Sequence, residues 1–383
     1  MLYFDHCAST QPYDEVVQTL SEVMRMQYSN PSSIHQAGLA AEKLVTRARE
    51  VIAAALKVNP GEILFTSGAT ESNNIAIQGA ALKKKSRGNH IITTGIEHSS
   101  VYECCRLMQR QGFDVTYLPV DASGCIRLED LRAAITDQTV LVSIMHVNNE
   151  MGSIQPIAEI GKLLTDYPRI IFHVDGVQGL GKVPVQLKEW GVDLYSISAH
   201  KVRGPKGVGL LYCREGIQLQ SLYAGGEQER GLRPGTLNVP GIVAMAKAIR
   251  MTMERQPEAV EKLLQLRSQL IQVIDSIPAL ELNSGRDTEC AAPHIVHFSY
   301  PGMKPEVIIH MLEEFGIMAS TQSACSSKDL KPSRVLLAMG CNEARAAGGI
   351  RISLAVEQSE QDIATLEAAL RAIVTKLKPL ERG

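Results

Sequence analysis

Short apolar segments alternate with longer amphipathic segments through the middle of the chain. Seven apolar segments have the length of strands, at residues 62–66, 90–94, 115–118, 139–145, 170–174, 194–198 and 208–213. Helical patterns separate several of them, at residues 71–84, 99–111, 128–135 and 157–166. This alternation favours βαβ units and a mostly parallel sheet with helices on both faces. The last two segments are too close for a crossover helix, so they predict an antiparallel pair. We therefore predict an α/β fold around a mostly parallel, mixed seven-stranded sheet.

The pattern changes after about residue 240 and predicts a second, smaller α+β domain. From there the sequence predicts, in order, two helices, two strands and a last helix, at residues 242–255, 258–277, 294–300, 349–354 and 360–378, with the domain boundary near residues 255–257. A chain of 383 residues is long enough for two or three domains. We assign residues 13–255 to the large domain, and residues 1–12 and 256–383 to the small one.

The balance of charge and hydropathy excludes several classes of protein. Lys and Arg total 39 against 41 Asp and Glu, so the chain lacks the basic excess of a nucleic-acid binder. Hydrophobic residues make up 45% of the chain, which is too many for a disordered protein with a net charge of −2. No apolar run approaches the ~18 residues of a membrane span, and the first residues lack a signal-peptide pattern. We expect a cytoplasmic protein that contacts neither membrane nor nucleic acid directly.

The eight cysteines form no C-x-x-C pair and no cluster with zinc spacing, so we expect no metal site. In a reducing compartment their thiols stay reduced. Cys325 differs from the others because it lies in the small, polar stretch Ser323-Ala324-Cys325-Ser326-Ser327, where an accessible thiolate suits nucleophilic chemistry. The remaining cysteines are interpreted as packing residues, except Cys7, whose role stays open.

Two turns after predicted strands carry residues suited to an anionic or polar ligand. Ser67-Gly68-Ala69-Thr70-Glu71 would expose backbone N–H groups at a helix N-terminus, where a phosphate binds, although a simple helix cap also explains the pattern. Asp175 ends a strand at the edge where α/β proteins bind ligands, and a helix N-cap is the alternative. The segment from Gly176 to Lys182 is not a P-loop, because Val183 replaces the hydroxyl residue that would bind Mg²⁺.

A third turn, Ser198-Ala199-His200-Lys201, follows a strand directly. A desolvated lysine at such a place can form a Schiff base with a carbonyl compound. Lys206, in the Gly-rich turn that follows, is more simply a solvated lysine. His98 at a helix start and Asn149 at a strand end are further candidates, each also explained as a cap or turn residue.

Together these motifs resemble the cysteine desulfurases of the NifS/IscS-like type. That family belongs to the aminotransferase-like, fold-type I enzymes that use pyridoxal 5′-phosphate. The resemblance covers nearly the whole chain, from Asp5 through Asn30-Pro31-Ser32-Ser33 to Ile350-Arg351-Ile352-Ser353, and the motifs follow the family's order. It implies a homodimer, L-cysteine as the substrate and a sulfur-acceptor protein as the partner.

The resemblance also implies roles for the matching positions. Lys201 would hold the cofactor, Asp175 would pair with its pyridinium nitrogen, and His98 would stack on its ring and relay protons. The other cofactor contacts would come from Gln178 and Asn149 near the phenolic oxygen and from Ala69, Thr70, Ser198 and His200 at the phosphate. Thr236 would contact the phosphate in the second subunit of the dimer.

The substrate and the transferred sulfur would be held by a further set of residues. Arg351 and Asn30, with Asn149 nearby, would bind the substrate carboxylate, since a guanidinium suits that planar anion. The Cys325 thiolate would attack the sulfur of L-cysteine, giving L-alanine and a persulfide on Cys325. The chain departs from the family pattern at five positions, Cys7, Arg203, Glu227, Gln322 and Ala347.

Two other functions stay open at this point. A selenocysteine lyase or an aminotransferase would share the cofactor, although an aminotransferase needs no thiol like that of Cys325. A sulfur-relay or scaffold protein would act by binding, which the presence of Lys201, Asp175 and His98 disfavours. The acceptor also stays open among iron–sulfur scaffolds, tRNA-thiolating enzymes, and thiamine or molybdenum cofactor pathways.

Overall fold

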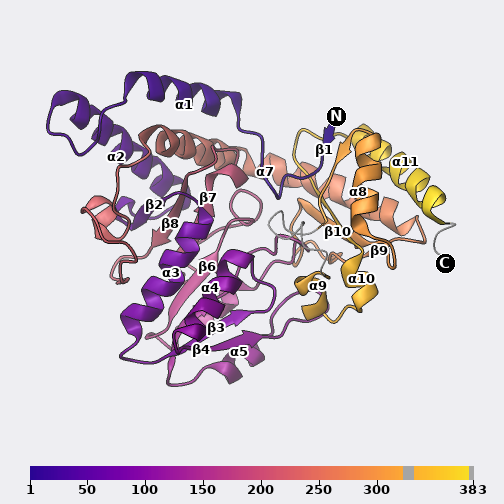
Figure 1. The fold of residues 1–383 in the computed structure, drawn as a ribbon, viewed down its shortest axis with the longest axis horizontal. Coiled ribbons are helices and arrows are strands. Elements are labelled where there is room, and N and C mark those ends of the chain that lie inside the picture. The colour runs from indigo at the N-terminus through magenta and orange to yellow at the C-terminus, as the bar shows by residue number, and fades with distance from the viewer. Residues whose placement is uncertain (322–331, 379–383) are drawn as a thin grey trace.

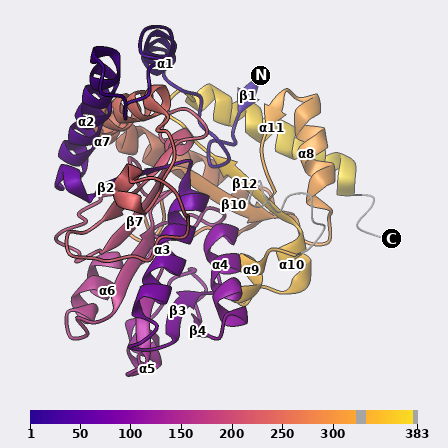
Figure 2. The same ribbon diagram turned by 60° about the vertical axis from the view of Figure 1, so that its left-hand side comes forward.

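The computed structural model describes residues 1–321 and 332–378 (Figures 1 and 2). Its larger sheet has seven strands in the order β2-β8-β7-β6-β5-β3-β4. Their bounds are β2 Ile63–Thr66, β3 His90–Thr94, β4 Asp114–Leu118, β5 Thr139–Ser143, β6 Ile171–Asp175, β7 Leu194–Ser198 and β8 Gly209–Cys213. Strand β8 runs antiparallel to β7 and β2, and the other pairs are parallel. The predicted α/β class, the seven strands and the antiparallel pair are confirmed.

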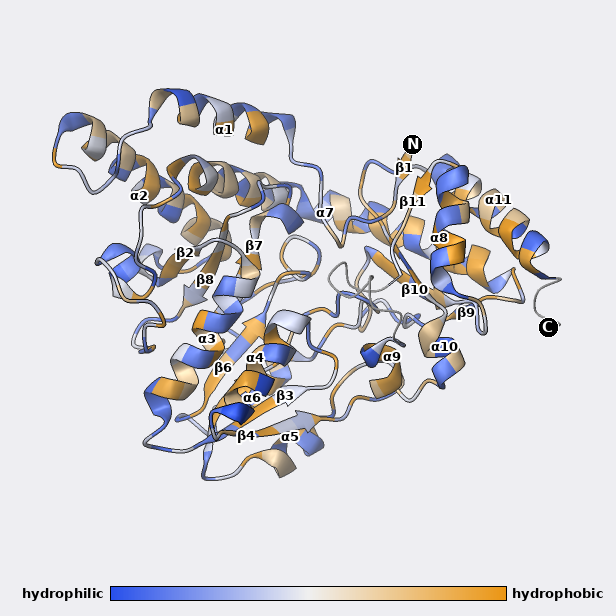
Figure 3. Cartoon of the chain, viewed as in Figure 1, coloured by the Kyte–Doolittle hydropathy of each residue, from blue (hydrophilic) through white to orange (hydrophobic). Residues whose placement is uncertain are grey.

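Successive residues of each strand face two separate apolar cores. On β2, Ile63 and Phe65 belong to one core and Leu64 to the other. The core around Leu64 is closed by α3 and α4, and the opposite core by α2, α5, α6 and the first half of α7. Because helices cover both faces, every residue of strands such as β3 and β6 is buried, and much of the central sheet is hydrophobic (Figure 3). The helices that precede α7 are α1 Asp14–Met26, α2 Gln36–Leu56, α3 Ala69–Lys84, α4 Ser99–Arg110, α5 Leu128–Ala134 and α6 Ile157–Leu164.

Helix α7 is a single helix of 37 residues, Val239–Asp275, that continues through Pro257. The prediction of two helices separated near this proline is therefore wrong. Pro257 lacks a backbone N–H, which leaves the carbonyl of Met253 without its helical donor. Residues around the proline are exposed, so water can reach that carbonyl. Both halves of α7 pack on apolar cores, which keeps the helix continuous across the exposed stretch.

The C-terminal part of the chain has its own apolar core, formed by α8, α11, the second half of α7 and a small antiparallel sheet in the order β12-β10-β9. Phe4 joins this core, and β1 at the start of the chain pairs with β11. The division into residues 13–255 and residues 1–12 plus 256–383 stays a prediction. The elements are β1 Leu2–Tyr3, β9 Glu281–Leu282, β10 Ile295–Ser299, α8 Pro305–Glu314, β11 Ile317–Met318, α9 Arg334–Ala338, α10 Glu343–Ala347, β12 Gly349–Ser353 and α11 Glu360–Leu377.

Three short 3₁₀ turns complete the elements, η1 Pro60–Glu62, η2 Ala199–Lys201 and η3 Gln228–Gly231. Within the described ranges, no helix combines the length and the hydrophobicity that crossing a membrane requires.

The fold generates a prediction at Gly161, in α6, where the helix lies against the loop before β7. A Cβ atom at this position would overlap the carbonyl oxygen of Trp190, which is backbone and cannot rotate away. We expect Gly161→Ala to lower the free energy of unfolding by about 1–3 kcal/mol, although alanine is the better helix former. The measurement is urea unfolding followed by circular dichroism. Gly61→Ala is the matched control, because no atom lies within 4 Å of its added Cβ; equal stability losses for both variants would contradict the packing interpretation.

Candidate active site

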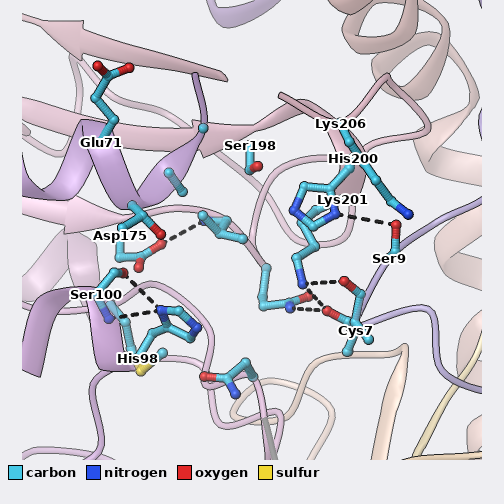
Figure 4. A pocket seen from close by; sticks show the side chains of 18 of the residues that line it. Cys7, Ser9, Glu71, His98, Ser100, Asp175, Ser198, His200, Lys201 and Lys206 are labelled. Atoms are coloured by element: carbon cyan, nitrogen blue, oxygen red, sulfur yellow. Dashed lines mark hydrogen bonds between the residues drawn. The ribbon is translucent and has the colours of Figure 1, made fainter. Parts of the chain in front are cut away.

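A cavity of about 510 Å³ lies at the carboxyl ends of β6 and β7, beside the N-terminus of α3 (Figure 4). Parallel sheets commonly bind ligands at this edge. The segment from Cys7 to Ser9 and the strand β12 supply the opposite wall. Ten of the predicted site residues line the cavity together: Ala69, Thr70, His98, Asn149, Asp175, Gln178, Ser198, His200, Lys201 and Arg351.

The N-terminus of α3 supplies an anion site at one end of the cavity. The helix begins at Ala69 after Gly68, and no side chain caps it. Gly68 has a φ of 153°, a backbone conformation that favours glycine. A Cβ atom added to Gly209 would lie 2.7 Å from the Cα of Gly68, so glycine at position 209 lets β8 approach the turn. The first N–H groups of the helix have no partner within the helix and attract an anion.

A chain of buried hydrogen bonds joins Asp175 to His98 through two residues of the neighbouring helices. Asn73 Nδ2 donates to Asp175 Oδ2 at 2.9 Å and to Ser100 Oγ at 2.9 Å. Ser100 Oγ in turn lies 2.8 Å from His98 Nδ1, and the Ser100 main-chain N–H donates to the same nitrogen. Burial lowers the pKa of His98, with the negative charge of Asp175 acting in the opposite direction.

Asn73 is the residue that the sequence interpretation missed. It is fully buried within α3, in the polar run Thr70-Glu71-Ser72-Asn73-Asn74. A buried asparagine within a helix needs partners outside its own helix. That polar run directly after the anion turn was the available signal.

Lys201 ends the short η2 turn after β7 and reaches across the cavity to the start of the chain. Its Nζ donates to the main-chain carbonyl oxygens of Cys7 and Ala8, the latter at 2.9 Å (Figure 4). Ser9 Oγ lies 3.3 Å from His200 Nδ1 on the same wall. Burial raises the pKa of the Cys7 thiol, so this side chain is protonated at neutral pH. The sequence singled out Cys7 but gave no reason to place Ala8 or Ser9 beside the lysine.

Gln178 lies in the cavity wall, and its contacts link both parts of the chain. Its Nε2 donates to the Cys7 carbonyl at 3.1 Å, and its Oε1 lies 3.4 Å from His294 Nε2. The predicted contact with the phenolic oxygen of a cofactor stays a prediction.

Arg351 is the cationic group at the far end of the cavity, with 1% of its surface exposed. One terminal nitrogen pairs with Asp5 Oδ1 at 2.9 Å, and the other donates to the main-chain oxygen of Asn149 at 2.8 Å. Its Nε is buried and has no hydrogen-bond partner among the described residues. A buried donor of this kind fits a carboxylate ligand.

Two of the predicted residues that the structure describes, Asn30 and Thr236, do not line the cavity. Asn30 is exposed, and its Oδ1 accepts from the Ser32 N–H at 2.9 Å. Thr236 is exposed and does not line the cavity of its own chain. Cys325 and Gln322 lie outside the described residues. Among the other thiols, Cys290 is exposed, so its interpretation as a packing residue is wrong.

Glu97 places a buried carboxyl directly before His98. Its Oε1 accepts from Thr94 Oγ1 at 2.7 Å and from the Met145 N–H at 3.0 Å. Burial raises the pKa of Glu97 to about 8, so the side chain is neutral at pH 7.

The cavity residues fit pyridoxal 5′-phosphate. The carboxylate of Asp175 suits a pyridinium nitrogen, the amine of Lys201 suits the carbonyl group, and the α3 N-terminus suits the phosphate. The unpartnered Nε of Arg351 suits the carboxylate of an amino acid.

Comparison with known proteins agrees with this chemistry. The profile of the family described as aminotransferase class-V matches residues 2–366. The chain is 43% identical over 380 residues to a protein named cysteine desulfurase IscS from Clostridium botulinum, covering 99% of this chain and 96% of the relative. It is 41% identical over 380 residues to a protein of the same name from Dictyoglomus turgidum, with the same coverage. A solved structure described as a NifS-like protein superposes with a TM-score of 0.92 at 38% identity, covering 98% of this chain and 100% of that one.

The buried carboxyl of Glu97 predicts a specific dependence of stability on pH. Between about pH 5 and 8 the folded state holds a proton on Glu97 that the unfolded state releases. Raising the pH through this window therefore favours unfolding, by at most about 1.4 kcal/mol per pH unit. Glu97→Gln keeps the hydrogen-bond acceptor and removes the titration. We expect the stability of the variant, relative to the unchanged chain, to increase from pH 6 to pH 8 in urea unfolding. A constant difference across these pH values would show that Glu97 is ionised in the folded state.

Proposed function

The chain belongs to the class-V aminotransferases, and from that premise we infer that it is a cysteine desulfurase that uses pyridoxal 5′-phosphate. The observation that carries this conclusion is the convergence of Lys201, Asp175 and the unpartnered Nε of Arg351 on one cavity at the N-terminus of α3. The reaction takes sulfur from L-cysteine and leaves L-alanine.

We propose that this chain holds the cofactor at three points. Lys201 binds its carbonyl carbon covalently, Asp175 pairs with its ring nitrogen, and the first turn of α3 with Ser198 and His200 binds its phosphate. When bound, the cofactor supplies an electron sink for negative charge at the Cα of the substrate. Asp175 supports this chemistry because Asn73 and the Val177 N–H, at 3.1 Å, fix its two carboxylate oxygens.

We assign proton transfer to Lys201 and His98. We propose that the Lys201 amine takes the proton from Cα and returns it there. His98 Nδ1 accepts from Ser100, so the ring proton is assigned to Nε2, which is the nitrogen that can exchange it within the cavity. Its lowered pKa keeps the imidazole neutral at pH 7.

We assign binding of the substrate carboxylate to Arg351. Asp5 and the Asn149 carbonyl hold two of its nitrogens, which leaves Nε for the substrate carboxylate. The guanidinium is buried, so its interaction with that anion is only weakly screened by water.

We propose Cys325 as the sulfur acceptor within the enzyme, on the strength of its Ser-rich sequence context. Its thiolate attacks the substrate sulfur, a new S–S bond forms, and the C–S bond breaks with its electron pair remaining on carbon. Protonation of that carbon gives L-alanine, and Cys325 carries the persulfide. A second protein then receives the sulfane sulfur.

The finer parts of the function are also proposals. Thr236 is exposed and does not line the cavity of its own chain, which leaves it available to a second copy of the chain in a homodimer. The IscS name of the relatives supports an acceptor in iron–sulfur cluster formation. A cytoplasmic location stays a prediction.

Two substitutions test this function. Lys201→Ala should abolish the yellow absorbance of the purified protein, because the covalent link to the cofactor is lost. Cys325→Ser should keep that absorbance and lose sulfide release from L-cysteine by at least about 100-fold. Absorbance spectra and a sulfide assay with L-alanine quantification provide the measurement. Desulfuration that persists in Cys325→Ser would overturn the role of this thiol, and a colourless unchanged chain would overturn the function.

Asn73→Ala tests the hydrogen-bond chain between Asp175 and His98. Loss of a donor to the buried carboxylate should lower kcat by about 10- to 100-fold, because hydrogen bonds to charged groups contribute about 1.5–3 kcal/mol. The KM for L-cysteine should change little, since Arg351 is not affected. The neighbouring Asn74→Ala is the control, because within the described ranges the hydrogen bonds of the Asn74 side chain are to the Thr70 carbonyl and Gln78 of its own helix. Equal activity of the two variants would remove Asn73 from the mechanism.

A further inference from the structure

Arg203 lies two residues after Lys201 and has an unusual backbone conformation. Its φ is 63°, in the left-handed region that favours glycine. An arginine there is strained by about 1 kcal/mol or more, so surrounding contacts must stabilise it. Residues with strained backbone conformations are concentrated at functional sites.

The backbone of Arg203 is hydrogen-bonded to the N-terminal segment. Its N–H donates to Thr10 Oγ1 at 2.9 Å, and its carbonyl accepts from the Tyr13 N–H at 3.4 Å. Thr10 also donates to the His200 carbonyl, from both Oγ1 at 2.8 Å and its backbone N–H at 2.9 Å. The turn that carries Lys201 is thus attached to residues 10–13.

The side chain of Arg203 connects this turn to a third segment. One terminal nitrogen donates to the Gln11 carbonyl at 3.3 Å, and the other pairs with Glu357, in the loop between β12 and α11. The Arg203 side chain is only 10% exposed, whereas that of Glu357 is 57% exposed. The guanidinium also lies over the ring of Tyr13, 5.6 Å from its centre.

The segment from Asp5 to Gln11 forms a wall between two cavities. Ser9 lines both the active-site cavity and a second cavity of about 1040 Å³ that Arg203 and Glu357 also line. Cys7 and Thr10 of this wall are buried, so packing, hydrogen bonds and ion pairs together fix its position. Asp5 holds one end of the segment through Arg351, and Arg203 holds the other end at Thr10 and Gln11.

We propose that Arg203 is a positioning residue for Lys201. By joining Glu357 to Gln11 and Thr10, it keeps the carbonyl groups of Cys7 and Ala8 against the Lys201 ammonium and so fixes where the amine lies. The inference rests on the role proposed for Lys201 in the reaction, but the placement itself does not require the cofactor.

Arg203→Gly is the informative substitution. Glycine accepts the left-handed conformation, so the variant removes the guanidinium without adding backbone strain. Glu357→Gln removes the charge of the ion-pair partner of Arg203 at an exposed position. It is the test variant if Arg203→Gly fails to fold. Arg286→Ala is the matched control, because Arg286 makes a two-point ion pair with Asp275, at 2.7 Å for both contacts, away from the cavity.

The first measurement is the acetylation rate of each lysine in the full chain after removal of cofactor, by peptide mass spectrometry. We expect Lys201 to be acetylated at least about fivefold faster in Arg203→Gly. The loss of about one hydrogen bond to its amine corresponds to a change of this size. Lys57 and Lys162, which are exposed and line neither cavity, should be unchanged, as should all lysines in Arg286→Ala. An unchanged rate at Lys201, or an equal rise at every lysine, overturns the proposal.

The second measurement is steady-state kinetics of the holoenzyme. Arg203→Gly should lower kcat by about tenfold with little change in the KM for L-cysteine, because Arg351 still binds the carboxylate. Arg203→Lys, which keeps the charge but not the forked geometry, should restore part of the kcat. Faster acetylation of Lys201 with an unchanged kcat overturns the positioning role. An unchanged chain that binds no cofactor overturns the proposed function alone, since the acetylation rates still report the placement.

Discussion

The ion pair between Arg351 and Asp5 joins the last strand of the chain to its first residues, and the cavity depends on it. The pair spans 346 positions of sequence. Arg351 is buried, so removal of Asp5 would leave a guanidinium charge without its partner, which is strongly unfavourable. The same pair brings the carbonyl groups of Cys7 and Ala8 to Lys201 and leaves Arg351 Nε without a hydrogen-bond partner among the described residues. One interaction therefore contributes to both the lysine and the carboxylate subsites.

Low polarity around the site sets the protonation states that the chemistry requires. Burial keeps Glu97 protonated and lowers the pKa of His98, while Asn73 and Val177 hold the carboxylate of Asp175. The carboxylate proposed to pair with a ring nitrogen is thus Asp175, and the adjacent glutamate adds no second negative charge. A second ionised carboxylate beside His98 would raise the pKa of that histidine and favour its charged form.

The parts of the structure that follow from local periodicity were predicted from the sequence. These parts are the strands of the large sheet and helices α3, α4 and α6. Their apolar residues recur at the positions that pack on the two faces of the sheet. The break at Pro257 was predicted wrongly, because packing of both halves of α7 outweighs the local effect of one proline. Asn73 and Ala8 were missed for a different reason, because their roles depend on which segments meet in space. The polar run around Asn73 indicated a buried polar contact but not its partner, and nothing in the sequence around Ala8 indicated its contact with Lys201.

The two anchors of the segment from Asp5 to Gln11 differ in strength because they differ in burial. Arg351 and Asp5 lie in a region of low exposure, where salt screens their attraction little. Glu357 is more than half exposed, so its attraction to Arg203 is weaker and more easily screened. Salt therefore weakens the Glu357 contact before it weakens the Asp5–Arg351 pair. The hydrogen bonds of Thr10 to His200 and Arg203 do not depend on that charge, so they keep the segment attached to the Lys201 turn when the ion pair is screened.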